Sequence, residues 1–282
     1  MADRPRTRSR RAHPTRADGT WLHDTPVAHP TTQSLAYAAF IGVGCIFRCH
    51  CYARDCPDIA EALGLTMSTL LSLRNLVVRR GSRPVLNGVS LDVRDDERVI
   101  IRGGIGVGKT TLLMAALGLV DHISGDIVLM NHPCSNEAAF AEARKDIGLL
   151  FQDPDDQLIG PTVLEDVEFG PLNLGWTPER AHRAADDALT QVGIEELAER
   201  PVHELSGGEK RLVALAGLLA MSPRLLLLDE PTASLDETTA SRILAILSET
   251  RLTMLIATHD PVCIEALSTR SVYLRNGQTS LD

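Results

Sequence analysis

The sequence lacks a cationic surplus, long apolar runs and a disulfide framework, and each absence excludes a class of protein. The net charge is −9, so no excess of Lys and Arg remains to neutralise nucleic-acid phosphates, and we expect no nucleic-acid partner. No uninterrupted apolar run reaches the roughly 18 residues that identify a membrane-spanning helix. Six cysteines among 282 residues are too few for a disulfide-stapled fold. A large soluble protein that works where thiols stay reduced is the expectation.

Residues 1–66 differ in composition from the rest of the chain. They open on the arginine-rich stretch RPRTRSRRAHPTR, lack hydrophobic periodicity and include the 13-residue apolar run LAYAAFIGVGCIF. The segment before that run is too long, and the cleavage site after it too poor, for a signal peptide, so export is not expected. We interpret residues 1–66 as a disordered or wrongly annotated extension, with Met67 as the true start, and residues 67–282 as the folded domain.

The same segment contains four of the six cysteines, with His50 among them. Such a cluster could bind zinc, nickel or an iron–sulfur centre, although its spacings match no pair of Cys-x2-Cys knuckles. Metal binding here therefore stays an alternative to an inert extension. The four cysteines are Cys45, Cys49, Cys51 and Cys56.

A phosphate-binding loop follows the first strand-like run of the folded part. The β-branched run Val99–Ile101 leads into GGIGVGKTT, which fits the P-loop spacing of two glycines, a lysine and a threonine. Glycines let backbone N–H groups surround a phosphate, the following helix points its positive end at the same place, and the lysine adds a charge. The candidate nucleotide-binding residues of this loop are Gly103, Gly104, Ile105, Gly106, Val107, Gly108, Lys109, Thr110 and Thr111.

Three further short apolar runs each end in a polar residue. Ile147–Phe151 is followed by Gln152, Leu225–Leu228 by Asp229 and Glu230, and Leu252–Ala257 by Thr258 and His259. Short apolar runs that alternate with helical patterns are typical of parallel strands covered on both faces, so we predict an α/β fold. In such sheets the ligand lies beyond the carboxyl ends of the strands, and these polar residues should meet there.

The chemistry of phosphoryl transfer assigns a role to each of these residues. Mg²⁺ prefers oxygen ligands, which Thr110, Gln152 and Asp229 can supply directly or through water. Glu230, next to the metal-side carboxylate, is the expected general base for an attacking water. His259 can orient that water or contact the γ-phosphate. ATP and Mg²⁺ are thus the expected cofactors.

A second candidate anion site is the stretch ELSGGEKRLVALAG. Ser206 and Glu209 have the spacing of a capping box at the start of a helix, and Leu212, Leu215 and Leu219 predict one buried face. The free N–H groups at such a start, around Ser206, Gly207 and Gly208, favour an anion. Because the P-loop already binds this chain's own phosphate, the second site is expected to cover the nucleotide of another subunit.

The combination of these motifs resembles the nucleotide-binding subunit of ATP-binding cassette (ABC) transporters over about residues 71–281. LSGG precedes LLLLDEP, with the P-loop upstream and THD downstream. The resemblance implies a P-loop NTPase of the ABC fold: a mostly parallel core sheet, an N-terminal antiparallel β region and a helical signature subdomain at about 155–222. It makes Gln152 the Q-loop glutamine, 205–209 the signature, 225–230 the Walker B strand and His259 the switch histidine.

The segment FQDPDDQLIGPTVLEDVEFGPLNLG, residues 151–175, gives a narrower match. It looks like the ATPase subunits of energy-coupling factor importers, most of all the cobalt and nickel branch. The match implies a homo- or heterodimer of ATPases at the cytoplasmic face of the membrane, with a transmembrane coupling subunit and a substrate-binding membrane subunit. Asp153, Asp155 and Asp156 would offer carboxylates to basic residues of that coupling subunit.

The sequence departs from the family at three positions and leaves other functions open. Arg80 stands where members usually carry an adenine-stacking aromatic residue, Ile105 replaces the usual Asn or Ser of the P-loop, and Asp96 replaces a customary turn glycine before Glu97. A guanidinium plane can still stack on a base. The alternatives are the same machinery importing a vitamin such as biotin, a soluble ABC ATPase of DNA repair or translation, and a small-molecule P-loop kinase.

Overall fold

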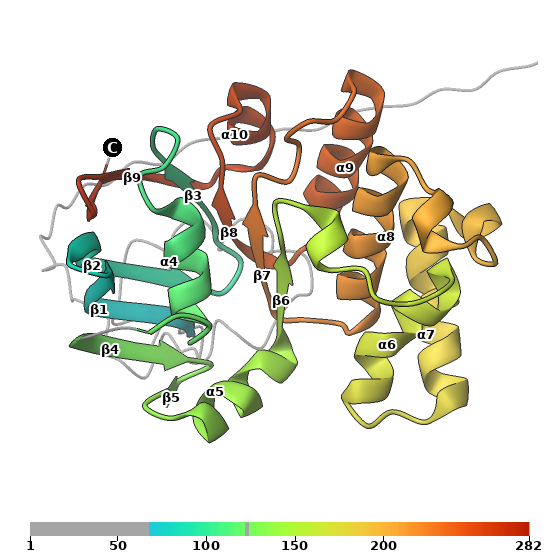
Figure 1. Cartoon of the computed structure of the whole chain (residues 1–282), viewed down its shortest axis with the longest axis horizontal. Coiled ribbons are helices and arrows are strands. Elements are labelled where there is room, and N and C mark those ends of the chain that lie inside the picture. The colour runs from blue at the N-terminus through green and yellow to red at the C-terminus, as the bar shows by residue number, and fades with distance from the viewer. Residues whose placement is uncertain (1–67, 122–123, 282) are drawn as a thin grey trace, which may run out of the picture. The chain divides into compact units, whose positions relative to one another are not determined.

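The computed structural model describes residues 68–121 and 124–281, which form two sheets and a set of helices (Figure 1). The predictions for residues 1–66, including the cysteine cluster, lie outside the described residues. The larger sheet has the strand order β10-β9-β3-β8-β7-β6. Its strands are β3 (Arg98–Arg102), β6 (Ile147–Leu150), β7 (Leu225–Asp229), β8 (Thr253–Ala257), β9 (Arg270–Arg275) and β10 (Gln278–Leu281).

Five strands of the larger sheet run parallel, and only the β9–β10 pair is antiparallel. The β9–β10 connection is the two-residue turn Asn276–Gly277, in which both residues have positive φ, as the Asn-Gly pair predicts. The second sheet is antiparallel, in the order β2-β1-β4-β5. Its strands are β1 (Thr69–Arg80), β2 (Arg83–Arg94), β4 (Ser124–Leu129) and β5 (His132–Pro133).

The described residues form seven α-helices and four short 3-10 turns. The α-helices are α4 (Lys109–Ala116), α5 (Glu137–Ala143), α6 (Val163–Asn173), α7 (Pro178–Val192), α8 (Gly207–Ala220), α9 (Glu237–Glu249) and α10 (Pro261–Leu267). Short 3-10 turns are η2 (Arg144–Asp146), η3 (Pro154–Asp156), η4 (Glu195–Leu197) and η5 (Val202–Glu204). In the part of the chain that the structure describes, none of them is long and apolar enough to cross a membrane.

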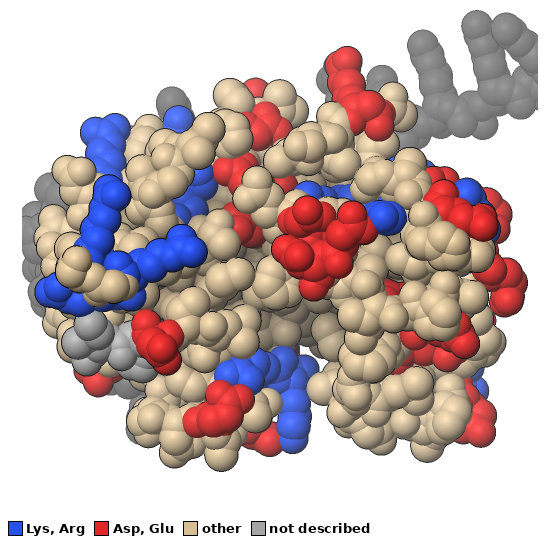
Figure 2. All heavy atoms as spheres, viewed as in Figure 1, with Lys and Arg blue, Asp and Glu red and all other residues tan. Residues whose placement is uncertain are grey.

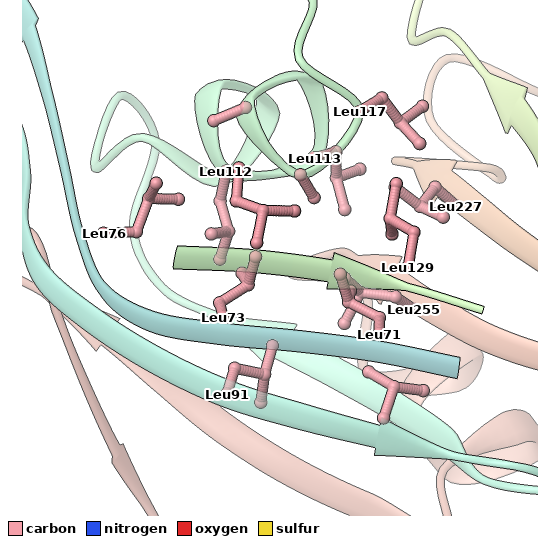
Figure 3. Close-up of a cluster of buried hydrophobic side chains, with 14 of the residues drawn as sticks. Leu71, Leu73, Leu76, Leu91, Leu112, Leu113, Leu117, Leu129, Leu227 and Leu255 are labelled. Atoms are coloured by element: carbon pink, nitrogen blue, oxygen red, sulfur yellow. The ribbon is translucent and has the colours of Figure 1, made fainter. Parts of the chain in front are cut away.

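The parallel sheet is buried on both faces, which explains its continuous apolar strands. Successive residues of β7 alternate between two hydrophobic clusters: Leu225 and Leu227 belong to one, Leu226 and Leu228 to the other. The first cluster lies under α4 and the antiparallel sheet, where leucines of α4, β1 and β4 meet those of β7 and β8 (Figure 3). The second lies under α6 to α10. The ABC-type α/β fold predicted from the sequence is confirmed.

Helix α8 is buried more completely than its leucine pattern predicts. Leu212 and Leu215 are buried, but Leu219 is only half-buried, and the continuous stretch from Arg211 to Ala216 is buried on every side of the helix. The reason is that α8 packs against α6, α7 and the β6 edge of the sheet at the same time. The single buried face inferred from Leu212, Leu215 and Leu219 was therefore wrong, and α8 is a central helix of its subdomain.

Candidate active site

The P-loop connects β3 to α4 through left-handed glycines. Gly106 has φ 76° and Gly108, the N-cap of α4, has φ 105°, a region that glycine enters without the Cβ clash of other residues. A Cβ on Gly108 would also lie 2.9 Å from Val85 of β2, so the loop is closely backed by the antiparallel sheet. No side chain caps α4, which leaves the N–H groups of its first turn free for an anion.

Lys109 is buried at the bottom of this loop. Its exposed fraction is 7%, and Nζ donates to the carbonyl of Gly103 at 3.1 Å. The same atom lies 3.2 Å from Oε1 of Glu230, at the end of β7. The lysine predicted to contact phosphate is thus paired directly with the carboxylate predicted to act as the base.

Asp229, the last residue of β7, is buried beside Thr110. Burial raises the pKa of Asp229, and a hydrogen bond with Thr110 only partly opposes that shift. Among the described residues, Oδ1 of Asp229 is one of four buried side-chain atoms without a hydrogen-bond partner. A buried, unsatisfied carboxylate oxygen next to a threonine hydroxyl is the donor set that a hard divalent cation requires.

Glu230 is fixed by four donors. Its Oε2 accepts from the Thr258 hydroxyl at 2.9 Å and from the His259 backbone N–H at 3.3 Å, while Oε1 lies 2.8 Å from His259 Nδ1 and faces Lys109. Burial alone would raise the pKa of Glu230, but the hydrogen bonds from His259, Thr258 and Lys109 together lower it below the ordinary value. Thr258, completely buried, received no role from the sequence, although its place at the end of the β8 run pointed to this edge.

Gln152 lies two residues beyond β6, and its backbone is held by a residue that the sequence analysis missed. The two guanidinium arms of Arg211, on α8, donate to the carbonyls of Phe151 and Gln152. Arg211 is only 2% exposed, whereas the Gln152 side chain is exposed. A charged residue directly before the apolar run LVALAGLLA was the available signal, since a helix with apolar residues on all sides has no solvent face for it.

The structure separates the second anion site from the first. Ser206 and Glu209 form the predicted capping box, with Glu209 N 3.3 Å from Ser206 Oγ and Ser206 N 2.7 Å from Glu209 Oε2. In Figure 1, α8 and α4 lie on opposite sides of strands β6 to β8, so the P-loop and the start of α8 are far apart in this chain. Ser206, Gly207 and Gly208 therefore do not join Lys109, Asp229, Glu230 and His259.

The departures from the family pattern at Arg80 and Ile105 are both exposed. Arg80 ends β1 and faces Arg83 across a two-residue turn, at the tip of the β1–β2 hairpin. Ile105 is 90% exposed in the P-loop. A hollow of about 450 Å³ opens beside the loop, and Gly103, Gly104, His259 and Tyr273 are among the residues that line it.

Comparison with known proteins assigns the chain to a family. A family model described as ABC transporter matches residues 86–233. The chain belongs to the ABC transporter family. An ABC transporter ATP-binding protein of Brucella suis is 49% identical to this ABC subunit over 212 residues, or 75% of this chain and 88% of that protein. The energy-coupling factor transporter ATP-binding protein EcfA of Methanosphaera stadtmanae is 39% identical over 199 residues, or 69% of this chain and 72% of that protein.

Solved ABC structures share the fold of this subunit. CbiO1 of Clostridium perfringens, described as part of the ABC transporter complex CbiONQ, matches with a TM-score of 0.68 and 35% identity over 76% of this chain and 87% of that chain. A dimeric bacterial ABC transporter cassette matches with a TM-score of 0.67 and 28% identity over 75% of this chain and 98% of that chain. The chain is thus an ABC transporter ATPase, of a class whose cassettes act as dimers.

Proposed function

We propose that this ABC ATPase energises an energy-coupling factor importer for a transition-metal cation, cobalt or nickel. The observation that carries the proposal is the segment from Phe151 to Gly175, whose sequence resembles that branch of the family. The similarity to EcfA and to CbiO1 supports the energy-coupling factor class. The preference for a metal over a vitamin rests on the sequence resemblance alone.

At the P-loop, this chain's own residues bind and orient ATP. The free N–H groups of α4 and Lys109 hold the β- and γ-phosphates. Thr110 and Asp229 hold Mg²⁺, with Gln152 as a third ligand directly or through water, and the buried unpartnered Oδ1 of Asp229 supports this assignment. The bound cation neutralises the charge of the β- and γ-phosphate oxygens.

Glu230 is the general base of this proposal, and its pairing with Lys109 regulates its basicity. A γ-phosphate bound by Lys109 draws Nζ away from Oε1 of Glu230, which removes one of the hydrogen bonds that lower the pKa of Glu230. The pKa of Glu230 then rises from its lowered position, because only the hydrogen bonds from His259 and Thr258 still oppose the effect of burial. His259, which keeps its bond to Glu230, orients the attacking water. ATP binding itself therefore prepares the base.

The capped start of α8 completes the site of a second subunit. Gly207 and Gly208 present N–H groups at a helix N-terminus that lies apart from this chain's own P-loop, while Ser206 donates its own N–H to Glu209 and caps the helix. A head-to-tail pair of cassettes, either two copies or two related chains, brings that end over the partner's γ-phosphate. We infer that residues 67–282 form one such cassette, with the helical subdomain at about 155–222.

The surface between β6 and α6 is the proposed docking site for the transmembrane coupling subunit. Asp153 and Asp156 of this segment are exposed, and Figure 2 shows an acidic patch on the face where the segment lies in Figure 1. Asp155 is already paired with Lys210 of α8, with Oδ1 and Nζ 2.6 Å apart, so it is less free to bind a partner than the sequence predicted. Docking there places the ATPase at the cytoplasmic face of the membrane, beside a substrate-binding membrane subunit.

Two alternatives use the same ATPase site. A vitamin such as biotin could replace the metal, because the cargo is bound by a membrane subunit and not by this chain. A soluble ABC ATPase of DNA repair or translation would need neither the coupling subunit nor its docking surface.

The test is purification of this protein from its native membranes in mild detergent, followed by mass spectrometry and by transport of labelled Co²⁺, Ni²⁺ and biotin in reconstituted vesicles. We expect a small polytopic coupling subunit, a second membrane protein and ATP-dependent uptake of one of the two metals. Uptake of biotin alone would replace the metal by the vitamin. Recovery of the protein without partners from the soluble fraction would overturn the transport proposal.

A further inference from the structure

Arg211 occupies an unusual place for an arginine. It lies in the second turn of α8, five residues after the N-cap Ser206, and it is the only arginine among the buried residues of the described chain. Burying a guanidinium is costly unless its donors are satisfied. The position therefore indicates a specific task for this side chain.

Arg211 holds two consecutive carbonyls of the loop after β6. Its Nη1 donates to Phe151 and its Nη2 to Gln152, whereas Nε has no hydrogen-bond partner among the described residues. A planar guanidinium that donates hydrogen bonds to two carbonyls fixes both their spacing and their orientation, which a flexible ammonium cannot do. The backbone that carries Gln152 is thus fixed from α8, although the Gln152 side chain is free to contact a ligand.

The charge of Arg211 also reaches the metal side of the site. Burial lowers the pKa of Arg211, and the negative charges of Asp153 and Asp229 oppose that shift. The guanidinium therefore lies within electrostatic reach of Asp229, the carboxylate proposed to hold Mg²⁺.

A second basic residue of α8 holds the same loop at its other end. Lys210 pairs with Asp155 in η3, three residues after Gln152. Unlike Arg211, Asp155 is exposed, so the Lys210 pair is screened by solvent and contributes little. The rigid attachment is that of Arg211.

We propose that Arg211 is a positioning residue that holds Gln152 at the distance from Asp229 needed for Mg²⁺·ATP. The inference rests on the proposed role of Gln152 as an Mg²⁺ ligand. Loss of the guanidinium frees the backbone at residues 151 and 152, so Gln152 no longer reaches the cation, while Lys109 and the P-loop still bind the phosphates.

The test compares Arg211→Met and Arg211→Lys with Gln152→Ala, and uses Arg144→Met as the matched control. Arg144 also donates to a backbone carbonyl, that of Leu117 at 2.9 Å, at the C-terminal end of α4 and thus at the end opposite the P-loop. Two quantities are measured with the full chain: the Mg²⁺ concentration that half-saturates the enhancement of ATP-analogue binding, and hydrogen exchange of the peptide that spans residues 147–160. Melting temperatures check that each variant is folded.

We expect Arg211→Met and Gln152→Ala to weaken Mg²⁺ binding about 10-fold, the usual cost of losing an outer-shell partner, with unchanged ATP-analogue binding in EDTA. Arg211→Met and not Gln152→Ala should speed exchange at 147–160. Arg211→Lys should restore part of both effects, because one ammonium can reach one carbonyl, and it replaces Arg211→Met if that variant does not fold.

Two outcomes overturn the inference and are distinguishable. If Gln152→Ala weakens Mg²⁺ binding but neither Arg211 variant does, Arg211 does not position Gln152. If Gln152→Ala has no effect, the assignment of Gln152 to Mg²⁺ fails, and the inference built on it fails as well. An equal effect of Arg144→Met would reduce the role of Arg211 to general stability.

Discussion

Lys109 and Glu230 form a buried ion pair, with Nζ 3.2 Å from Oε1 and both side chains less than 10% exposed. The pair joins the residue that binds phosphate to the residue proposed to activate water. A ligand that binds Lys109 therefore weakens the ion pair between Lys109 and Glu230. The first prediction follows from this coupling.

Replacing Glu230 by Gln should stop hydrolysis without harming nucleotide binding. The amide keeps the shape of the side chain but loses the charge that pairs with Lys109, so the lysine is freer for phosphate. Turnover should fall at least about 100-fold, the usual contribution of a general base, and ATP should bind more tightly than to the unmodified chain. Equilibrium binding and single-turnover hydrolysis measure the two effects. With ATP, light scattering should report a stable dimer, and a persistent monomer with weakened binding would contradict the proposed site.

A comparison of the capping boxes of α6 and α8 can distinguish helix capping from a role of Ser206 in ATP hydrolysis. Thr162 and Glu165 cap α6 with the same pair of bonds that Ser206 and Glu209 make at α8. Ser206→Ala and Thr162→Ala should each lower the free energy of unfolding by about 1 kcal/mol in urea denaturation. Only Ser206→Ala should also lower ATP turnover, since Ser206 caps the helix end that is proposed to cover the partner's nucleotide, whereas Thr162 caps α6, to which no such role is assigned. Equal loss of turnover in both variants would mean that Ser206 acts only as a cap.

Asp229→Asn should stabilise the chain in the absence of Mg²⁺ and nucleotide. Burial raises the pKa of Asp229, so this group contributes stability below its unfolded pKa that is lost as the pH rises through its folded pKa. At neutral pH the ionised carboxylate is a net cost, and Asn removes its charge while keeping a buried polar side chain, so the gain should be at most about 1–3 kcal/mol. The gain should shrink toward acidic pH and reverse when Mg²⁺ and ATP are added. If the melting temperature of Asp229→Asn without Mg²⁺ and nucleotide is lower than that of the unmodified chain, the assignment of Asp229 as a metal ligand is refuted.

The contacts of His182, which link α7 to α6, should make the folded chain more stable at acidic than at alkaline pH. Its Nδ1 lies 2.6 Å from Glu168 on α6, and its Nε2 lies 3.6 Å from Asp186. The hydrogen bond to Glu168, and next the charge of Asp186, raise the pKa of His182 above 6.5, so its contribution is present below pH 6.5 and is lost above it. Melting curves of the unmodified chain and of His182→Gln from pH 6 to pH 8 should converge as the pH rises. Parallel curves would show that the pair contributes nothing.

The α/β class and the polar residues that follow its strands could be predicted because each rests on local signals, whereas the order of the strands could not. Apolar runs, the P-loop spacing and the capping box at Ser206 are all readable within a few residues. What the sequence could not provide is contact between distant segments. The contact of Arg211 with residues 151 and 152 depends on how α8 packs against the end of β6. The contact of Lys109 with Glu230 depends on how α4 packs against the end of β7.

Helix α8 shows the same limit in another way. Its leucines predicted one apolar stripe, but packing on three sides made burial nearly complete. Periodicity reports the face that must be apolar and cannot report how many neighbours surround a helix. Asp155 is a further example: its intrachain partner Lys210 is 55 residues away in the sequence.

The backbone of Glu230 has φ 44°, a left-handed conformation that is strained for any residue with a Cβ. It is imposed from both sides, by the bond from Glu230 N–H to the Ala257 carbonyl and by the bond from Ala233 N–H to the Glu230 carbonyl. Glycine would relieve the strain, but it would also leave Lys109 buried without its partner carboxylate, which costs more than the strain itself. Activity and folding thus make opposite demands on the backbone of Glu230, while its carboxylate serves both.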